Sequence, residues 1–419
     1  MRLPIGYGSV AKPFSLLNLR QTKVQFLVSA GEASGDLYAS GVIFHLKSLL
    51  PGLTCYGCAG PRLQAAGVEP VIDAAEISVV GLAEVVAHLP RIYGKYRQLV
   101  NYVRRNPPAA ALLTDNPDFN LRLARQLKRL QIPVFYLVAP QVWAWRQGRV
   151  KIIRELVDKL FCLFPFEEDW FRQRGVDATY IGHPLANLVR PAFSRAEFLG
   201  RHDLALNSRL LVLLPGSRPG EIARHLPVLL ETVAQLRRRF DLGVLLATPK
   251  GFGSHTVLHK FRERIAPLSI KVIENETWDC IAHASVALAA SGTVTMEAAV
   301  LGTPMVTFYK VNPLSWYAGR HLVKAPFLSM VNLIAEKRIV PELIQHDMTP
   351  SKLAAAAEEL LTDEARADRM RSDLLQVRQL LSPAQDPLAN TARSIANAMQ
   401  TAQSRLPLGR HDFVRETMN

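Results

Sequence analysis

The stretch that decides the fold is VQFLVSAGEASGD, residues 24–36. Its first five residues are mostly apolar, as in a buried strand, and the next eight are small or acidic, as in a loop. A helical pattern then runs over residues 37–50, and Pro51 and Gly52 end it. The stretch therefore predicts a strand, a loop and a helix in succession, which is the repeating unit of an α/β sheet.

The same unit recurs along most of the chain. Further strands are expected at residues 53–56, 109–114, 134–138, 160–164 and 179–181, and then at 210–214, 243–247, 270–273, 286–290 and 305–309. Short strands that alternate with longer helices favour parallel sheets joined by right-handed crossovers. Because the pattern runs through two such series, we expect two doubly wound, Rossmann-like α/β domains.

The division between these domains is expected near residues 182–195, which contain Pro184 and Pro191. The expected organisation is an N-terminal extension (1–23), a first domain (24–185), a second domain (186–380), and a C-terminal helix and tail (381–419) that packs back on the first domain. Ligands of such sheets bind beyond the carboxyl ends of the strands. We therefore expect the functional site in a cleft between the two domains.

The chain of 419 residues is basic, with 50 Lys and Arg against 36 Asp and Glu and a net charge of +14. This charge favours an anionic partner: a phosphate-bearing substrate, an anionic membrane surface or nucleic acid. The basic residues are scattered over helices without a nucleic-acid-binding motif, so we expect no nucleic-acid partner. The longest weakly charged stretch, residues 286–309, contains Glu297 and Pro304 and is interpreted as a buried strand, helix and strand rather than a membrane span.

The four cysteines fit a reducing cytoplasm better than a disulfide-stabilised secreted protein. Cys55 and Cys58 have the spacing of a metal or redox pair, but they run along a predicted strand, and the other two cysteines are distant in sequence. We therefore expect buried, unreactive thiols and no metal site.

Two loops of the second domain suit a phosphate group. Residues 291–293 (Ser291, Gly292, Thr293) follow a predicted strand and open a helix, whose free N–H groups and dipole attract anions. Glu297 lies about one turn further, where its carboxylate could accept from ribose hydroxyls. Residues 216–218 (Gly216, Ser217, Arg218) form a second turn, and Arg suits a diphosphate. The alternatives are a plain helix cap and a solvated turn, but together the loops favour a nucleoside diphosphate; neither matches a Walker A loop or a dinucleotide fingerprint.

Asp115 directly follows the strand predicted at 109–114 and is the candidate general base, because a carboxylate there faces the cleft. Asp118 is better placed to cap the helix that follows, although position alone does not settle which acid has which role. Glu32 and Ser34 of the first loop are assigned to the acceptor region, where sugar hydroxyls would suit a carboxylate. The alternative for this loop is helix capping by Ser34 or Asp36.

Residues 79–105 combine an apolar face with basic flanks, and residues 316–324 hold a similar aromatic–basic cluster. A helix of this kind lies on a membrane or accepts acyl chains. The alternative is a helix that faces the core, and Pro90 interrupts any continuous helix across 79–105.

Several of these segments resemble motifs of the bacterial lipid-A-disaccharide synthase family. The matching segments are VSAGEASGD (28–36), GCAGPRL (57–63), DNPDFN (115–120), PQVWAWR (140–146), LLPGSR (213–218), SGT (291–293) and NLI (332–334). The double-Trp segment 140–146 is the most specific of them. The matches run in order over residues 24–380; Asn116 and Val331 depart from the residues that are usual in the family, which affects local loop shape.

The resemblance implies a GT-B glycosyltransferase with two Rossmann-like domains facing across a cleft, which needs no metal ion or other cofactor. It implies an inverting transfer of 2,3-diacylglucosamine from its UDP derivative to 2,3-diacylglucosamine 1-phosphate, with release of UDP. It assigns the base to Asp115, a polar position of the active-site region to Asn332, and the donor contacts to Arg218, Ser291, Gly292, Thr293 and Glu297. The expected location is the cytoplasm, peripheral on the anionic inner membrane, and a homodimer is left open.

Two other classes of function stay open at this point. One is another GT-B enzyme that acts on a UDP-sugar without acyl chains, either a glycosyltransferase or a UDP-sugar epimerase. The other is a non-catalytic carrier of lipid or nucleotide. Dependence of the rate on an acylated substrate separates the first class, and tight UDP binding without turnover would indicate the second.

Overall fold

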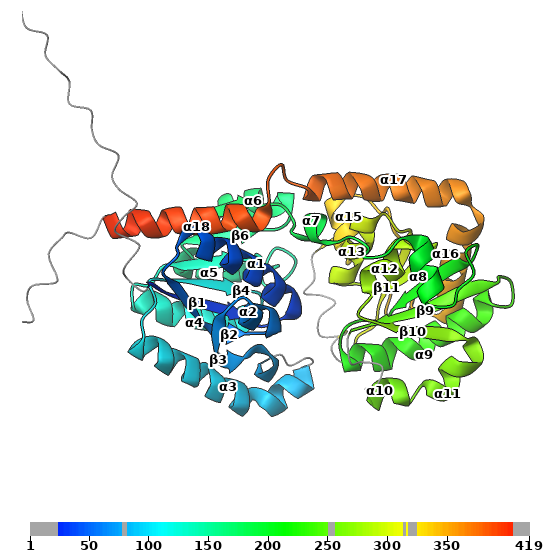
Figure 1. The fold of residues 1–419 in the computed structure, drawn as a ribbon, viewed down its shortest axis with the longest axis horizontal. Helices are drawn as coiled ribbons and strands as arrows, with labels where there is room; N and C mark the ends of the chain where they lie inside the picture. The colour runs from blue at the N-terminus through cyan, green and yellow to red at the C-terminus, as the bar shows by residue number, and fades with distance from the viewer. Residues whose placement is uncertain (1–23, 78–81, 250–255, 313–315, 317–324, 405–419) are drawn as a thin grey trace, which may run out of the picture.

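Two parallel sheets, each flanked by helices, make up the computed structural model, which describes residues 24–77, 82–249, 256–312, 316 and 325–404 (Figure 1). The first sheet has the order β3-β2-β1-β4-β5-β6-β7 and contains β1 (Val24–Ala30), β2 (Leu53–Ala59), β3 (Val68–Asp73), β4 (Ala110–Thr114), β5 (Val134–Leu137), β6 (Lys159–Cys162) and β7 (Ala178–Tyr180). The second has the order β10-β9-β8-β11-β12-β13 and contains β8 (Arg209–Leu214), β9 (Leu242–Thr248), β10 (Ile270–Glu274), β11 (Val286–Ala290), β12 (Met305–Tyr309) and β13 (Glu342–Ile344).

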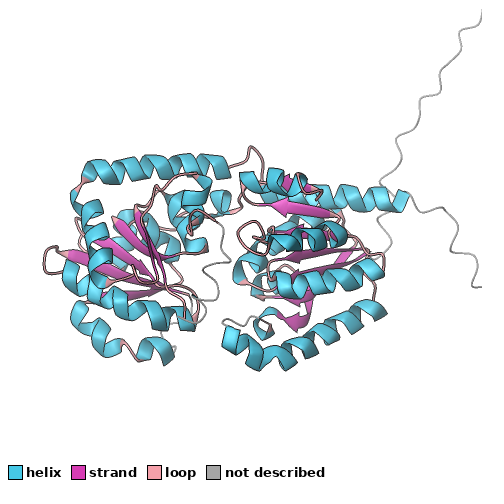
Figure 2. Ribbon diagram, turned by 180° about the vertical axis from the view of Figure 1, so that it is seen from behind, coloured by secondary structure: helices cyan, strands magenta, loops and turns pink. Residues whose placement is uncertain are grey.

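Helices connect the strands and cover both sheets (Figure 2). Those that follow strands of the first sheet are α1 (Ala33–Leu49), α2 (Pro61–Ala65), α3 (Leu82–Arg105), α4 (Pro117–Arg129), α5 (Val150–Leu156), α6 (Pro165–Arg172) and the short 3₁₀ turns Ala74–Glu76 and Gln147–Arg149. The later ones are α7 (Leu185–Leu188), α8 (Arg195–Arg201), α9 (Pro219–Leu236), α10 (Thr256–His259), α11 (Arg262–Ile265), the 3₁₀ turn Ala266–Leu268, α12 (Thr277–Ala282), α13 (Thr293–Leu301), α15 (Met330–Ile334), α16 (Pro350–Thr362), α17 (Glu364–Leu381) and α18 (Pro387–Ser404). The predicted fold class, two doubly wound α/β domains, is confirmed.

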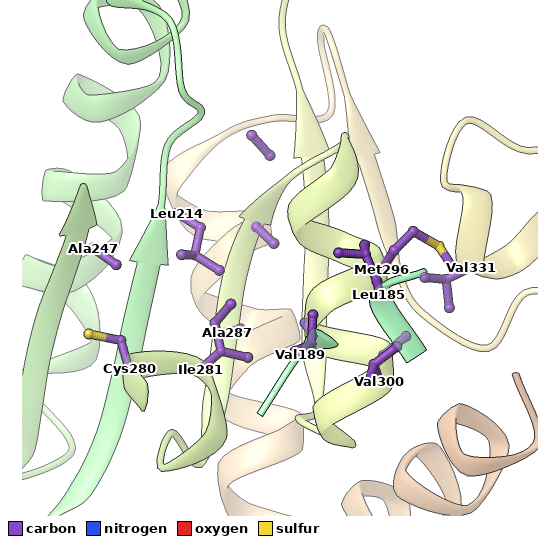
Figure 3. Packing of buried hydrophobic residues seen from close by; sticks show 14 of the residues in the cluster. Leu185, Val189, Leu214, Ala247, Cys280, Ile281, Ala287, Met296, Val300 and Val331 are labelled. Atoms are coloured by element: carbon purple, nitrogen blue, oxygen red, sulfur yellow. The ribbon is translucent and has the colours of Figure 1, made fainter. Parts of the chain in front are cut away.

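The central strands of both sheets are buried along almost their whole length. Every residue of β4 and of β11 is buried, and in β8 only Arg209 is exposed. Unbroken apolar strands are what a parallel sheet needs when helices cover both of its faces. Figure 3 shows the resulting packing around α13, where Leu185 from α7 lies close to Met296 of α13 and Val331 of α15. These layers fix the positions of the loops that leave the strands.

In each sheet the chain adds strands outward in one direction and then in the other. The reversal falls between β1 and β4 in the first sheet and between β8 and β11 in the second. The loops that follow these four strands are residues 31–32, 115–116, 215–218 and 291–292, and such reversal points are where doubly wound sheets bind ligands. Most of the sequence-predicted site residues lie at or next to this edge of each sheet, whereas Ser34, Glu297 and Asn332 lie within α1, α13 and α15.

The chain passes between the two domains twice, and the two passages lie side by side. His183 donates its backbone N–H to the carbonyl of Leu381, and the Tyr180 hydroxyl donates to the carbonyl of Leu380 at 2.7 Å. Gly182 has φ +85°, and a Cβ there would lie 2.3 Å from Cγ of Pro383, so only glycine fits this crossing. His183 is buried beside this crossing, and burial lowers its pKa to about 3.

After the second passage, α18 returns to the first domain and packs along α1, whereas α17 stays over the second domain (Figure 1). Gly41 of α1 faces Leu388 of α18 so closely that a Cβ at Gly41 would lie 2.5 Å from the Leu388 side chain. Buried Ala392, Ile395 and Ala396 give α18 an apolar face. The last described helix is thus held against the first helix of the first domain.

Three local expectations need correction. The sequence analysis missed β3 and β13, it expected Pro90 to interrupt the helix that is α3, which instead runs continuously over Leu82–Arg105, and it expected Asp118 to cap α4, which begins at Pro117. Asp118 therefore lies inside the first turn of α4 and does not cap the helix; it is exposed and pairs with Arg149. The residue at the cap position is Asn116, whose side chain makes no capping hydrogen bond.

All four cysteines are buried free thiols. In the parts of the chain that the structure describes, no group of three or more His, Cys, Asp or Glu side chains is placed to hold a metal ion. Among the same residues, no helix is both long enough and apolar enough to span a bilayer.

Candidate active site

Asp115 lies at the carboxyl end of β4 in a strained backbone conformation, with φ +50°. Its carboxylate accepts the backbone N–H of Gly31 at 2.7 Å and that of Glu32 at 3.1 Å. Its carbonyl oxygen accepts the side-chain amide of Asn120 at 3.1 Å. A non-glycine residue with positive φ is held in place only by its surroundings, and such residues concentrate at functional sites. These contacts hold the carboxylate at one position against the loop after β1.

Two glycines make space for this carboxylate. A Cβ at Gly35 would lie 1.7 Å from Oδ2 of Asp115, and a Cβ at Gly31 would lie 3.0 Å from Oδ1. Gly35 sits in the first turn of α1, so the helix approaches the carboxylate directly. The glycines of the first loop are therefore required for the placement of Asp115, a role that the spacing of the loop alone did not reveal.

Burial raises the pKa of Asp115 well above its ordinary value, and the negative charges of Glu32 and Asp36 act in the same direction. The two backbone N–H groups oppose this effect because they stabilise the ionised form. A carboxylate with a raised pKa is a stronger proton acceptor than one in water. The site therefore holds the group that a general base requires.

Asp36, in the first turn of α1, has a structural role. Its carboxylate accepts three backbone N–H groups at the start of α2: Gly60 at 2.9 Å, Arg62 at 2.9 Å and Leu63 at 3.2 Å. It caps α2 rather than its own helix, since Glu32 is the residue before α1 and no side chain caps that helix. Ser34 is half-buried in the first turn of α1, next to Gly35.

The turn after β8 faces this loop from the second domain. Gly216 has φ +117° and packs against Glu221, which accepts the Tyr309 hydroxyl at 3.0 Å. The Arg218 guanidinium lies 3.6 Å from the Glu221 carboxylate and 3.4 Å from that of Glu32. The backbone N–H of Glu32 also bonds to Asp115. Glu32 therefore links Asp115, the predicted base, to Arg218, the residue predicted to bind the diphosphate. Ser217 is exposed at the tip of the turn.

The start of α13 offers free donors beside this turn. Gly292 and Thr293 are exposed, and no side chain caps the helix. Ser291 is fixed by its backbone N–H, which donates to Phe308 at 2.8 Å, while its hydroxyl lies 3.4 Å from the carbonyl of Leu328. The first N–H groups of a helix have no partner within it, and the helix dipole adds a partial positive charge. The arrangement can receive an anionic group.

Glu297 lies one turn into α13 and is half-buried. Burial raises its pKa to about 7, while a hydrogen bond from Trp278 acts against this. Burial, and to a smaller extent the Glu297 charge, raise the pKa of Tyr38 on α1 of the first domain. The carboxyl group thus acts on a residue of the other domain, and it lies on the same helix as the exposed, uncapped start of α13.

Asn332 is buried, and its amide is occupied by protein groups on both sides. Its oxygen accepts the backbone N–H of Ile339 at 2.8 Å and of Val340 at 3.0 Å. Its nitrogen donates to the Val340 carbonyl at 2.9 Å and to the Glu342 carboxylate at 2.8 Å. Asn332 is therefore placed to shape the site rather than to contact a ligand, and Glu342, which the sequence analysis missed, is its partner.

The double-Trp segment after β5 lies at the boundary with the second domain. Trp143 is buried and donates its indole N–H to Glu167 at 3.0 Å, and Gln141 reaches the Met330 sulfur at 3.8 Å. Trp145 is exposed with the Arg146 guanidinium over its ring. The amphipathic segment is described only in part: α3 exposes Leu89 and Tyr93, but residues 78–81 and the side chains of residues 82–88 lie outside the described part, as does most of the cluster at 316–324.

The chain matches the family model "Lipid-A-disaccharide synthetase" over residues 26–396. The lipid-A-disaccharide synthase of Solibacter usitatus is 54% identical over 358 residues, which cover 85% of this chain and 93% of that relative. The enzyme of the same name from Geobacter sulfurreducens is 39% identical over 361 residues, covering 86% and 94%.

Solved structures of low sequence identity share the architecture. The UDP-GlcNAc 2-epimerase from Neisseria meningitidis bound to UDP-GlcNAc aligns with a TM-score of 0.60 at 11% identity, covering 91% of this chain and all of that one. The calicheamicin glycosyltransferase CalG4 aligns with a TM-score of 0.54 at 16% identity, covering 93% and 100%. These neighbours establish the GT-B fold alone. The family match and the identities to the named relatives, over nearly the whole described chain, establish that it belongs to the lipid-A-disaccharide synthetase family.

Proposed function

We propose that this glycosyltransferase moves 2,3-diacylglucosamine from UDP-2,3-diacylglucosamine to the 6-hydroxyl of 2,3-diacylglucosamine 1-phosphate, with inversion at the anomeric carbon. The observation that carries the proposal is the contact of the two site loops: Arg218 lies 3.4 Å from Glu32, whose backbone N–H bonds to Asp115. A base and an anion-binding turn at such close quarters suit a reaction in which an oxygen attacks carbon while a diphosphate leaves.

In this proposal the donor diphosphate lies between Arg218 and the start of α13. The guanidinium offers a planar pair of donors, and the N–H groups at Gly292 and Thr293 are directed at the same region. Gly216, Ser217 and Ser291 shape the two loops, and Glu297 accepts from the ribose. Both positive elements stabilise the charge that develops on UDP as the glycosidic bond breaks.

Asp115 is the proposed general base. Its carboxylate takes the proton from the acceptor 6-hydroxyl as that oxygen forms the new bond to the anomeric carbon. The electron pair of the broken bond leaves with UDP. Glu32 and Ser34, at the start of α1, face the acceptor sugar in this arrangement. Arg218, which pairs with Glu32 before the donor binds, turns to the diphosphate when it arrives.

We further propose that α3 brings the enzyme to an anionic membrane surface, where both acylated substrates reside. Leu89 is 48% exposed and Tyr93 is 57% exposed, and Arg97 lies over the Tyr93 ring. Exposed apolar groups beside arginines suit the boundary between lipid headgroups and acyl chains. The chain is then peripheral on the cytoplasmic face of the inner membrane.

The test is incubation of the full chain with UDP-2,3-diacylglucosamine and 2,3-diacylglucosamine 1-phosphate in detergent, followed by mass spectrometry of the products. The expected products are the disaccharide 1-phosphate and UDP. Turnover of UDP-sugars that lack acyl chains, at an equal or higher rate, would instead indicate another glycosyltransferase or an epimerase. UDP binding with no turnover of any of these substrates would indicate a carrier.

A further inference from the structure

One carboxylate outside the predicted site holds the segment that borders it. Glu342 begins β13, the edge strand of the second sheet, in register with Thr307 of β12, and it is half-buried. Its Oε2 accepts the backbone N–H of Leu328 at 3.0 Å, and its Oε1 accepts that of Ser329 at 3.0 Å. A third donor, the Asn332 amide, reaches Oε1 at 2.8 Å. Hydrogen bonds to an ionised carboxylate are stronger than neutral ones.

The Asn332 amide fixes the direction of this carboxylate. Its oxygen is held by the backbone N–H groups of Ile339 and Val340, so its nitrogen has little freedom to turn away from Glu342. Together the two side chains fasten the start of α15 to the start of β13. Both oxygens of the Glu342 carboxylate and both ends of the Asn332 amide have hydrogen-bond partners, and networks satisfied in this way are rigid.

The fastened segment touches both halves of the site. On one side, the Leu328 carbonyl is 3.4 Å from the hydroxyl of Ser291, at the entrance to α13. On the other, Met330 and Leu333 pack against the apolar cluster of the first domain, where Gln141 of the double-Trp segment contacts the Met330 sulfur. The position of residues 328–333 therefore affects the position of Ser291 and the packing of the two domains against each other.

We propose that Glu342 is a positioning residue for the UDP-sugar: it fixes Leu328 and Ser329 and through them holds Ser291 at the anion-binding end of α13. The inference rests on the proposed function, in which that end of α13 receives the nucleotide. Glu342 itself does not contact substrate. A glutamine at this position would replace one acceptor oxygen with an NH₂ group that meets an N–H donor, so one of the backbone bonds is lost.

The decisive variant is Glu342→Gln in the full chain, with the KM for each substrate and the Kd for UDP measured by calorimetry. We expect the donor KM and the UDP Kd to rise about ten-fold, as for a lost hydrogen bond to a charged group, and the acceptor KM to change less than about two-fold. The matched control is Asp373→Asn. It removes the carboxylate that forms an ion pair with Lys337, near the same segment, at 2.7 Å. The control should leave all three constants unchanged.

A double-mutant cycle with Ser291→Ala tests the route of the effect. If Glu342 acts through Ser291, the double variant binds UDP no more than about two-fold more weakly than the weaker single variant. Independent, multiplicative losses would overturn the proposal, as would a variant with lower thermal stability and unchanged UDP affinity. If Glu342→Gln does not fold, Glu342→Asp, which keeps the charge and shortens the reach, takes its place in the cycle. Absence of turnover in the unmodified enzyme would count against the proposed function, whereas the UDP measurements decide this inference separately.

Discussion

The two sides of the site are built in opposite ways. On the first domain the Asp115 carboxylate is enclosed, with two N–H donors at hydrogen-bond distance and Gly35 packed directly against it. On the second domain Gly292 and Thr293 are exposed, and no side chain caps the helix that they begin. A base must have its position and pKa fixed before the substrate arrives, whereas an anion site must keep its donors free for the ligand.

The largest effect is expected where the enclosed side loses the proposed proton acceptor. Asp115→Asn keeps the size of the side chain and most of its contacts but cannot accept the proton, so kcat should fall by ~10²–10⁴-fold. The UDP Kd, set by the other domain, should not change. Asp118→Asn is the control, since Asp118 is exposed and pairs with Arg149. A near-normal rate in Asp115→Asn would refute the assignment of the base.

Gly35→Ala should produce much of the same loss without touching the base itself. The new Cβ would lie 1.7 Å from Oδ2 of Asp115, and the cheapest relief is for the carboxylate to swing away from its two N–H donors. We expect kcat to fall by more than about ten-fold, with a loss of stability of roughly 1–3 kcal/mol. Gly200→Ala, where no atom lies within 4 Å of the new Cβ, should leave the rate unchanged. Full activity in Gly35→Ala would show that the enclosure of Asp115 is not needed.

The open side should respond in binding rather than in chemistry. Arg218→Gln removes the charge opposite the donor diphosphate, and we expect the UDP Kd to rise by roughly 10–100-fold, as for the loss of charged hydrogen bonds. Arg218→Lys should recover only part of the affinity, because lysine lacks the planar pair of donors. Titration calorimetry with UDP measures both, and Arg239→Gln, which breaks only the exposed pair with Glu358, is the control. An unchanged UDP Kd in Arg218→Gln would show that the diphosphate does not bind at this turn.

The central strands could be predicted from sequence because each is an unbroken apolar run between turn-forming residues. β3 could not, since Val68–Asp73 contains Pro70 and buries only Val68 and Ile72. β13 is three residues long and half-buried, too short for any periodicity to show. Both lie at sheet edges, where a strand has a partner on one side only and its residues are selected less strictly for burial.

The site could be predicted as far as it follows from the ends of strands. Asp115, Arg218 and Ser291 directly follow or closely follow predicted strands, so the topology alone brings them to the sheet edges. The functions of Asp36 and Glu342 depend on partners at residues 60–63 and 328–332, and no local pattern connects those segments. The space for Asp115 likewise depends on Gly31 and Gly35, which lie eighty or more residues away in sequence.

The smallest predicted effect concerns Glu297, a half-buried carboxyl group of the open side. Its pKa of about 7 in the folded chain exceeds the ordinary value of 4.5, so folding favours its protonated form, and stability is lost as pH rises from about 4.5 to 7. Glu297→Gln removes that loss. The variant should gain about 2 kcal/mol in the free energy of unfolding at pH 8 relative to pH 5, measured by urea denaturation at both values. Glu263→Gln, at an exposed position, should show no such difference. An equal gain at both pH values would mean that Glu297 is already ionised at pH 5 in the folded chain. In that case the raised pKa of Asp115 would have no counterpart at Glu297 on the open side.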